Sequence, residues 1–211
     1  MKTIERIAYF QNVQNDNPNV ELAKELASTG DKEAIKEIAE GLYHKNKRVQ
    51  SNCLKVLYEI AYREPVLVTK YSNDFLSLLD SKNNRMVWGS MIALDAMGEI
   101  NPLPILLNIE KIMTAIDKGS VITKLRGLSA MAKALYVDKT YNQKYFKYLL
   151  NHAMTCRPSE VAPILESIFP TIDTRENSDA FSWVMDKRLE SLSPRYKARV
   201  MKFKRKNYVL L

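Results

Sequence analysis

The sequence predicts an all-α fold, an α-solenoid of about five to six stacked helix pairs with a 37-residue period. One observation is the repeat itself, because the segments Asn46–Pro65, Asn83–Pro102 and Ser120–Lys139 start 37 residues apart. The other is composition. Only six glycines in 211 residues disfavour a sheet protein with many tight turns, and abundant Leu, Ala, Lys, Glu and Met favour helix. Fixed periods of this length are typical of arrays in which each unit packs on its neighbours.

We expect one repeat domain over residues 1–211, in which residues 1–30 form an N-terminal cap and a degenerate repeat. A short helix is predicted within residues 4–13 and a second over Val20–Ala27, with the turn cluster Gln14–Asn19 between them. Gly30 stands where a left-handed residue would end the second helix. Asp31 can then cap the next helix.

Residues 31–176 are predicted to be the regular repeats, each a first helix, a polar turn and a second helix. Apolar residues at i, i+1 and i+4 recur at the 37-residue step on both helices, as a stripe that packs on neighbours requires. The predicted first helices are Asp31–His44, Pro65–Asp80, Pro104–Lys118 and Tyr141–Thr155. The predicted second helices are Arg48–Arg63, Arg85–Ile100, Ile122–Val137 and Ser159–Phe169.

The net charge of +8 is confined to the last unit, a predicted basic capping repeat over residues 177–211. Residues 1–186 hold 23 basic and 23 acidic residues, whereas residues 187–206 hold nine basic residues and the single acid Glu190. The excess positive charge therefore lies at one end of the molecule. A terminal repeat needs a polar outer face, but a concentration of one sign of charge would also attract phosphates or an acidic protein.

Two runs of residues carry a resemblance to a known family. The pattern L-x-x-x-G-D-x-x-A-I-x-x-I at Leu26–Ile38, followed by N-x-R-V-x-x-x-C-L-x-V-L at Asn46–Leu57, resembles HEAT repeats. In that family Val-Arg begins the second helix, whereas here the pair Arg48–Val49 is reversed. The resemblance, over about residues 20–205, implies a scaffold for proteins, a nucleic-acid clamp or, in one bacterial branch, a DNA alkyl-base glycosylase.

The second helices of such solenoids line the concave binding face. Aromatic side chains beside arginines can anchor a protein partner or stack on a base, although they can also pack between adjacent helices. The predicted face residues are Arg48, Tyr58, Tyr62, Arg85, Trp88, Arg126 and Tyr136. A second predicted contact region is the basic C-terminal helix with Arg195, Lys197, Arg199, Lys202, Lys204, Arg205 and Lys206.

The sequence favours a non-enzymatic scaffold with a protein partner, and nucleic-acid binding is the main alternative. Base-excision chemistry would require a carboxylate to stabilise a positively charged sugar, and Asp95 or Glu99 beside Trp88 is the local candidate. No catalytic residue is predicted.

No metal site and no small-molecule cofactor are predicted. His152 and Cys156 are four residues apart, but no further His or Cys lies near them in sequence. The chain lacks a phosphate loop and an apolar run of membrane-spanning length. It also shows no signal peptide, and its two cysteines give no disulfide framework. We therefore expect a soluble cytoplasmic protein that does not bind a membrane.

Overall fold

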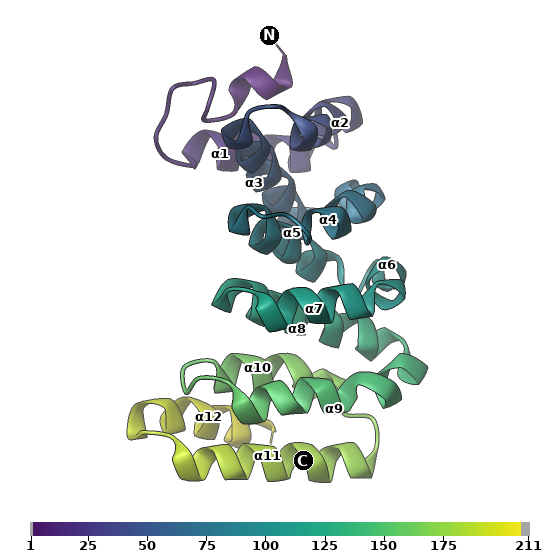
Figure 1. Cartoon of the computed structure of the whole chain (residues 1–211), viewed down its shortest axis with the longest axis vertical. Helices are drawn as coiled ribbons and strands as arrows, with labels where there is room; N and C mark the ends of the chain where they lie inside the picture. Colours follow the sequence, from purple (N-terminus) through teal and green to yellow (C-terminus); the bar gives the residue numbers. More distant parts are fainter. Residues whose placement is uncertain (1, 208–211) are drawn as a thin grey trace.

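The computed structural model describes residues 2–207, which form α-helices and short 3₁₀ helices and contain no strand. The helices stack in chain order along the long axis, from α1 near the N-terminal end to α11 and α12 at the C-terminal end (Figure 1). The predicted all-α fold is therefore confirmed. Along these residues, no helix is both long enough and apolar enough to cross a membrane.

One row of helices runs through the whole stack, and each member packs on the next. We call it the inner row. It consists of α1 (Asn17–Thr29), α3 (Lys47–Arg63), α5 (Asn84–Met97), α8 (Val121–Val137), α10 (Val161–Ile168) and α12 (Pro194–Asn207). These are the second helices of the pairs.

Most outer helices pack chiefly on the inner helices beside them, whereas α9 and α11 also pack extensively on each other. They are α2 (Lys32–Glu40), α4 (Ser72–Leu78), α6 (Pro102–Leu107), α7 (Ile109–Lys118), α9 (Lys139–Thr155) and α11 (Arg175–Ser191). The 3₁₀ helices η1 (Thr3–Arg6), η2 (Gly41–Tyr43), η3 (Pro65–Tyr71) and η4 (Phe169–Thr171) complete the described elements.

Polar caps recur at the repeat step and explain why the inner helices begin where they do. The side chains of Asn46 and Asn83 each accept a hydrogen bond from the backbone N–H two residues on, at 2.8 and 3.0 Å. Ser120, a further 37 residues along, accepts one from the N–H of Thr123. Such caps satisfy donors that the first helical turn leaves without a partner.

The start of the first regular unit also follows its sequence signals. Gly30 adopts a left-handed φ of 65° and ends α1, where a side chain would cost energy. Asp31 accepts a hydrogen bond from the N–H of Ala34 at 3.0 Å and caps α2. The first predicted helix shortens to η1, and α1 is longer than the predicted Val20–Ala27.

Three predicted outer helices are wrong in their continuity, and the first of them, predicted over Asp31–His44, divides into α2 and η2. The segment predicted as one helix over Pro65–Asp80 divides into η3 and α4, and that predicted over Pro104–Lys118 breaks at Asn108 between α6 and α7. The Asn108 side chain donates to the carbonyl of Pro104 at 2.9 Å, and the Ser72 hydroxyl donates to the carbonyl of Thr69. Such local bonds compete with the regular helical pattern.

Successive inner helices approach closely at small residues. At Gly127 of α8, an added Cβ would lie 2.4 Å from Cγ1 of Ile116 and 3.3 Å from Cε of Met91. Both neighbours are buried, so neither can move aside into solvent. Gly127 therefore sets how closely α8 packs against α7 and α5.

Replacement of Gly127 by valine should destabilise the protein by about 1–3 kcal/mol, because overpacking forces neighbouring side chains and backbone to shift. Urea unfolding followed by circular dichroism measures this change. The matched control is Ser129→Val, which adds the same β-branched residue to α8 where it faces an open groove. An unfolding midpoint for Gly127→Val equal to that of the control would contradict the close-packing argument.

Candidate partner-binding face

The inner row lies on the concave side of the stack, and two long-range contacts show this. The guanidinium of Arg126 on α8 lies 5.7 Å from the ring centroid of Tyr62 on α3, so the contact spans the intervening α5. Arg85 of α5 pairs with Asp16, which precedes α1, at 3.1 Å and spans α3. Side chains of alternate helices can meet in this way only where the helices converge.

A buried carboxylate organises the centre of this face. Asp95 is 2% exposed and pairs with Arg126 at 3.0 Å and with Lys133 at 2.8 Å. Lys133 also donates to the backbone carbonyl of Asp95 at 2.8 Å. Both cationic side chains remain more than a third exposed. One buried negative charge thus holds two cations at the surface in a fixed position.

Ionisation in this cluster is stable. Burial lowers the pKa of Arg126, but the hydrogen bond to Asp95 and the nearby Tyr62 outweigh it, so the pKa ends above its ordinary value. Burial also raises the pKa of Tyr62. Arg126 therefore stays charged and Tyr62 neutral across the physiological range.

The predicted aromatic face residues divide into two kinds. Tyr58 is only 6% exposed, with its ring centroid 6.1 Å from that of Trp88 and 6.3 Å from that of Tyr62. Tyr58 and the half-buried Trp88 join α3 to α5, so the expectation that Tyr58 is available to a partner is wrong. Tyr62 and Tyr136 are 45% and 50% exposed and offer contact surface.

A three-residue ion network lies beside these rings on α3. Glu59 pairs with Lys55 at 2.7 Å and with Arg63 at 2.6 Å, one helical turn away on either side. Burial raises the pKa of Glu59, but the bonds to Lys55 and Arg63 lower it further, and the result is below its ordinary value. The charged form of Glu59 is therefore favoured by folding.

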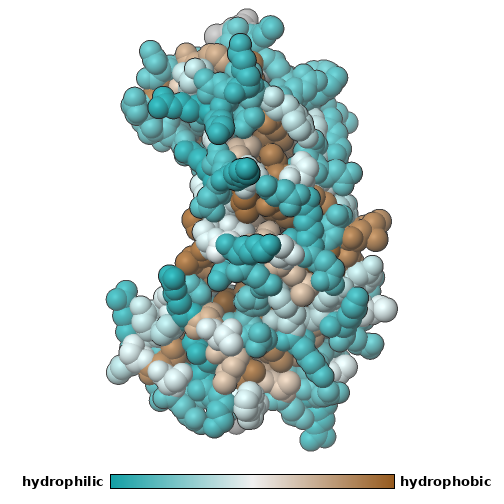
Figure 2. Space-filling model, viewed as in Figure 1, coloured by the Kyte–Doolittle hydropathy of each residue, from teal (hydrophilic) through white to brown (hydrophobic). Residues whose placement is uncertain are grey.

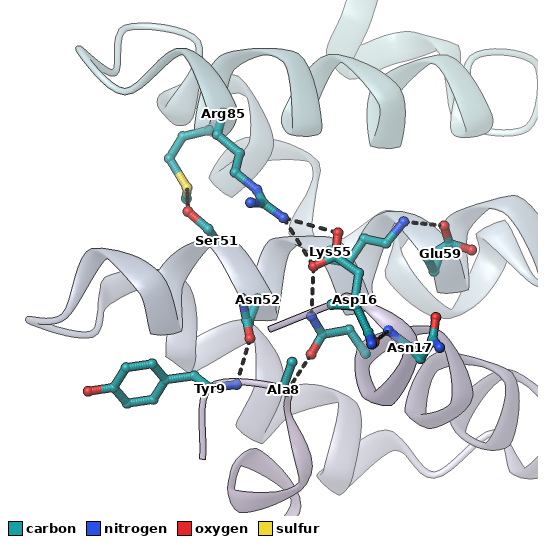
Figure 3. A network of polar contacts seen from close by, with 12 residues as sticks. Ala8, Tyr9, Asp16, Asn17, Ser51, Asn52, Lys55, Glu59 and Arg85 are labelled. Atoms are coloured by element: carbon teal, nitrogen blue, oxygen red, sulfur yellow. Dashed lines mark hydrogen bonds and ion pairs between the residues drawn. The ribbon is translucent and has the colours of Figure 1, made fainter. Parts of the chain in front are cut away.

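The N-terminal segment makes polar contacts with α3 and α5 (Figure 3). The backbone N–H of Tyr9 donates to Asn52 of α3 at 2.9 Å, and Asp16 binds Arg85 through both carboxylate oxygens. Arg48 is exposed and lines a polar groove of about 800 Å³ between this segment and the starts of α3 and α5. The matched arginines Arg48 and Arg85 therefore differ, because Asp16 already engages Arg85.

A second groove lies toward the C-terminal end of the face, with a volume of about 580 Å³. Its walls come from Glu99 just beyond α5, from α8 and α10, from Pro170 of η4 and from Arg199 of α12. Apolar side chains and charges of both signs line it. Arg126, Lys133 and Arg199 are the cations, and Glu99 and Glu166 are the acids.

The predicted basic contact residues all lie on α12. Lys204 is half-buried and pairs with Asp186 at 2.6 Å, and Arg199 pairs with Glu166 at 3.3 Å. The others, Arg195, Lys197, Lys202, Arg205 and Lys206, are exposed. This helix therefore presents a dense positive surface at the end of the stack.

Two further features bear on chemistry. Nε2 of His152 pairs with Asp117 at 3.2 Å, whereas the thiol of Cys156 donates to the carbonyl of Ala153, so the two are engaged separately. Within residues 2–207, no group of three or more His, Cys, Asp or Glu residues is placed to hold a metal. Asp95, the candidate carboxylate for base excision, lies beneath two cations and presents almost no surface.

Outside the concave face, the visible surface is largely hydrophilic (Figure 2). Hydrophobic residues gather at the edge where α6 lies. Leu103 and Leu107 of this helix are 60% and 67% exposed, and Val66 of the preceding unit is 69% exposed.

Comparison with known proteins supports the fold. No protein-family model matches the chain, and no curated protein matches it. Among solved structures, it is similar to the crystal structure of an engineered protein from the Northeast Structural Genomics Consortium, with a TM-score of 0.59 and 18% identity. The match covers 95% of this chain and 94% of that one. At this identity the likeness shows fold alone, and the class is an all-α helical repeat protein.

Asp16 and Lys133 contact predicted face residues or their partners but are not among the predicted site residues, and Asp95 is predicted only as a candidate carboxylate for base excision. Asp95 and Lys133 lie off the predicted core stripe of their helices, which is a usable signal. Asp16 carries no such signal, because it stands in a turn and its partner Arg85 is 69 residues away.

The pair Asp95–Arg126 should show an energetic coupling of about 1–3 kcal/mol in a double-mutant cycle with Asp95→Asn and Arg126→Met, because one partner is buried. The control cycle uses Glu166→Gln and Arg199→Met, where both partners are exposed and about 0.2–1 kcal/mol is expected. Chemical unfolding of the four proteins in each cycle gives the values. Equal coupling in the two cycles would contradict the organising role of Asp95.

Glu59→Gln should destabilise the protein near neutral pH, and the difference from wild type should shrink on acidification. The folded pKa of Glu59 lies below its ordinary value, so its contribution is present above that value and is lost as pH falls through about 4 and below. Thermal unfolding between pH 7 and pH 3 tests this, with the exposed Glu33→Gln as control. A difference independent of pH would rule out the ion network as its source.

Proposed function

We propose that this chain is a HEAT-like, non-enzymatic scaffold of the cytoplasm whose concave face binds a protein partner. The observation that carries the proposal is the fixed cluster of Asp95, Arg126 and Lys133 with the exposed rings of Tyr62 and Tyr136. Exposed aromatic residues and positioned arginines are frequent anchors of protein interfaces. Because Asp95 already holds Arg126 and Lys133 in place, these side chains lose little conformational freedom on binding.

The charge of the face favours protein over nucleic acid. Across the inner row, the cations Lys55, Arg63, Arg126, Lys133 and Arg199 are interspersed with the acids Glu59, Asp95, Glu99 and Glu166, so the face carries charges of both signs. A nucleic-acid strand carries regularly spaced negative charges and is bound by tracks of positive charge. The concentrated positive charge is instead on α12, at one end of the stack.

Removal of both exposed rings by Tyr62→Ala with Tyr136→Ala should abolish capture of a partner. The matched control removes two exposed aromatics away from this face, Tyr43 in η2 and Trp183 on α11, which are 65% and 57% exposed. Quantitative affinity purification from cells of the source organism compares both variants with wild type. A partner must be retained by the control and depleted from the concave-face variant.

Retention of every partner by Tyr62→Ala with Tyr136→Ala would overturn the assignment of this face. Duplex DNA binding is measured in parallel at low and moderate salt. Salt-sensitive DNA binding that Lys202→Glu with Arg205→Glu abolishes would support the nucleic-acid alternative, and release of an alkylated base would be needed for glycosylase activity.

A further inference from the structure

We propose that the C-terminal half of the concave face is a docking groove for an acidic segment of a protein partner, one that combines carboxylate side chains with apolar ones. The inference rests on the proposed function and narrows it to the chemistry of the partner. Three features of the groove between α8 and α12 carry it: an apolar floor, a fixed pair of cations and a basic edge.

The floor of the groove offers apolar surface for burial. Leu125 of α8 and Pro163 of α10 are half-buried, and Pro170, just beyond α10, is exposed. The groove volume of about 580 Å³ accommodates several side chains of a bound segment. Apolar side chains of a partner that cover this surface would remove it from water, which stabilises the complex.

The two cations of the central cluster form one wall. Arg126 and Lys133 both line the groove, and the carboxylate of Asp95 fixes their positions from beneath. Because one buried carboxylate faces two cations, the cluster keeps one net positive charge toward the groove. A carboxylate of a partner would meet cations that are already ordered, which lowers the cost of binding.

Helix α12 supplies the basic edge. Arg195, Arg199, Lys202 and Lys206 are spaced at i, i+4, i+7 and i+11, so they share one stripe of the helix. Arg199 lines the groove, and Arg195 lies beside it against the start of α10. Among residues 2–207, no ion pair involves Arg195, Lys202 or Lys206. Their charge is therefore available to a ligand.

The acidic residues in the groove favour a peptide over a nucleic acid as its ligand. Glu99 and Glu166 both line it and would repel a strand that carries a phosphate at every nucleotide. A peptide can place its carboxylates against Arg126, Lys133 and the α12 stripe and its apolar side chains near the acids. Complementary charge of this kind also accelerates association.

The test is selection of peptides from a random display library on the immobilised full chain, followed by affinity measurements on the selected peptides by fluorescence anisotropy. The expected peptides carry net negative charge and apolar residues. Arg199→Glu with Lys202→Glu should weaken their binding by about tenfold or more, and added salt should weaken it as well. The matched control, Lys32→Glu with Lys36→Glu, reverses two exposed charges on outer helix α2 and should leave affinity unchanged.

Circular dichroism establishes that each variant is folded. If the charge reversals disturb α12, the milder pair Arg195→Gln with Lys202→Gln replaces them and should weaken binding by about threefold. Selected peptides that lack net negative charge, or that bind the α12 variants as tightly as wild type, overturn the proposal. Tighter binding of oligo(dT) than of any selected peptide also overturns it and assigns the groove to nucleic acid.

The failure of this inference is distinguishable from that of the proposed function. The selected peptides could be neutral and still bind the variant Tyr62→Ala with Tyr136→Ala more weakly than wild type. That result would support a protein-binding concave face that has no preference for acidic segments. Failure to select any peptide overturns the assignment of the groove as a docking site. Affinity purification with the tyrosine variants tests the scaffold function independently.

Discussion

The structure depends on close contact between successive inner helices. Where α3, α5 and α8 meet, glycine stands at the contact: a Cβ on Gly89 of α5 would lie 2.7 Å from Leu54 of α3, and one on Gly127 of α8 would lie 3.3 Å from Met91 of α5. Larger residues at these positions would hold the inner helices further apart. The outer helices cover the opposite side of the row. The resulting curvature brings alternate helices within side-chain reach and creates the concave face.

Asp95 connects this packing to the surface chemistry. Burial of a carboxylate is costly unless it is paired and hydrogen-bonded, and both cations that pair with it come from the next inner helix, α8. The same interactions therefore hold α5 to α8 and position Arg126 and Lys133 at the face. Stability and binding capacity are linked in one cluster, so substitutions there must be interpreted with measurements of folding.

The two ends of the concave face differ in what they offer a partner. At the N-terminal end, the chain binds its own face through Asp16 and Arg85 and through Tyr9 and Asn52. At the C-terminal end, α12 presents cations beside a groove with an apolar floor. This asymmetry gives the stack a direction, so a bound segment with unevenly distributed acidic residues would have a preferred orientation.

The sequence by itself determined the helical class, the 37-residue period, and the caps at Gly30 and Asp31, because these depend on neighbours in the chain and on a regular repeat of apolar positions. Only the tertiary structure decided that Tyr58 is buried, that Asp16 engages Arg85, and that Asp95 holds Arg126 and Lys133 together. These contacts join residues 31 to 69 positions apart. They depend on how the stacked pairs curve, and no local pattern specifies that curvature.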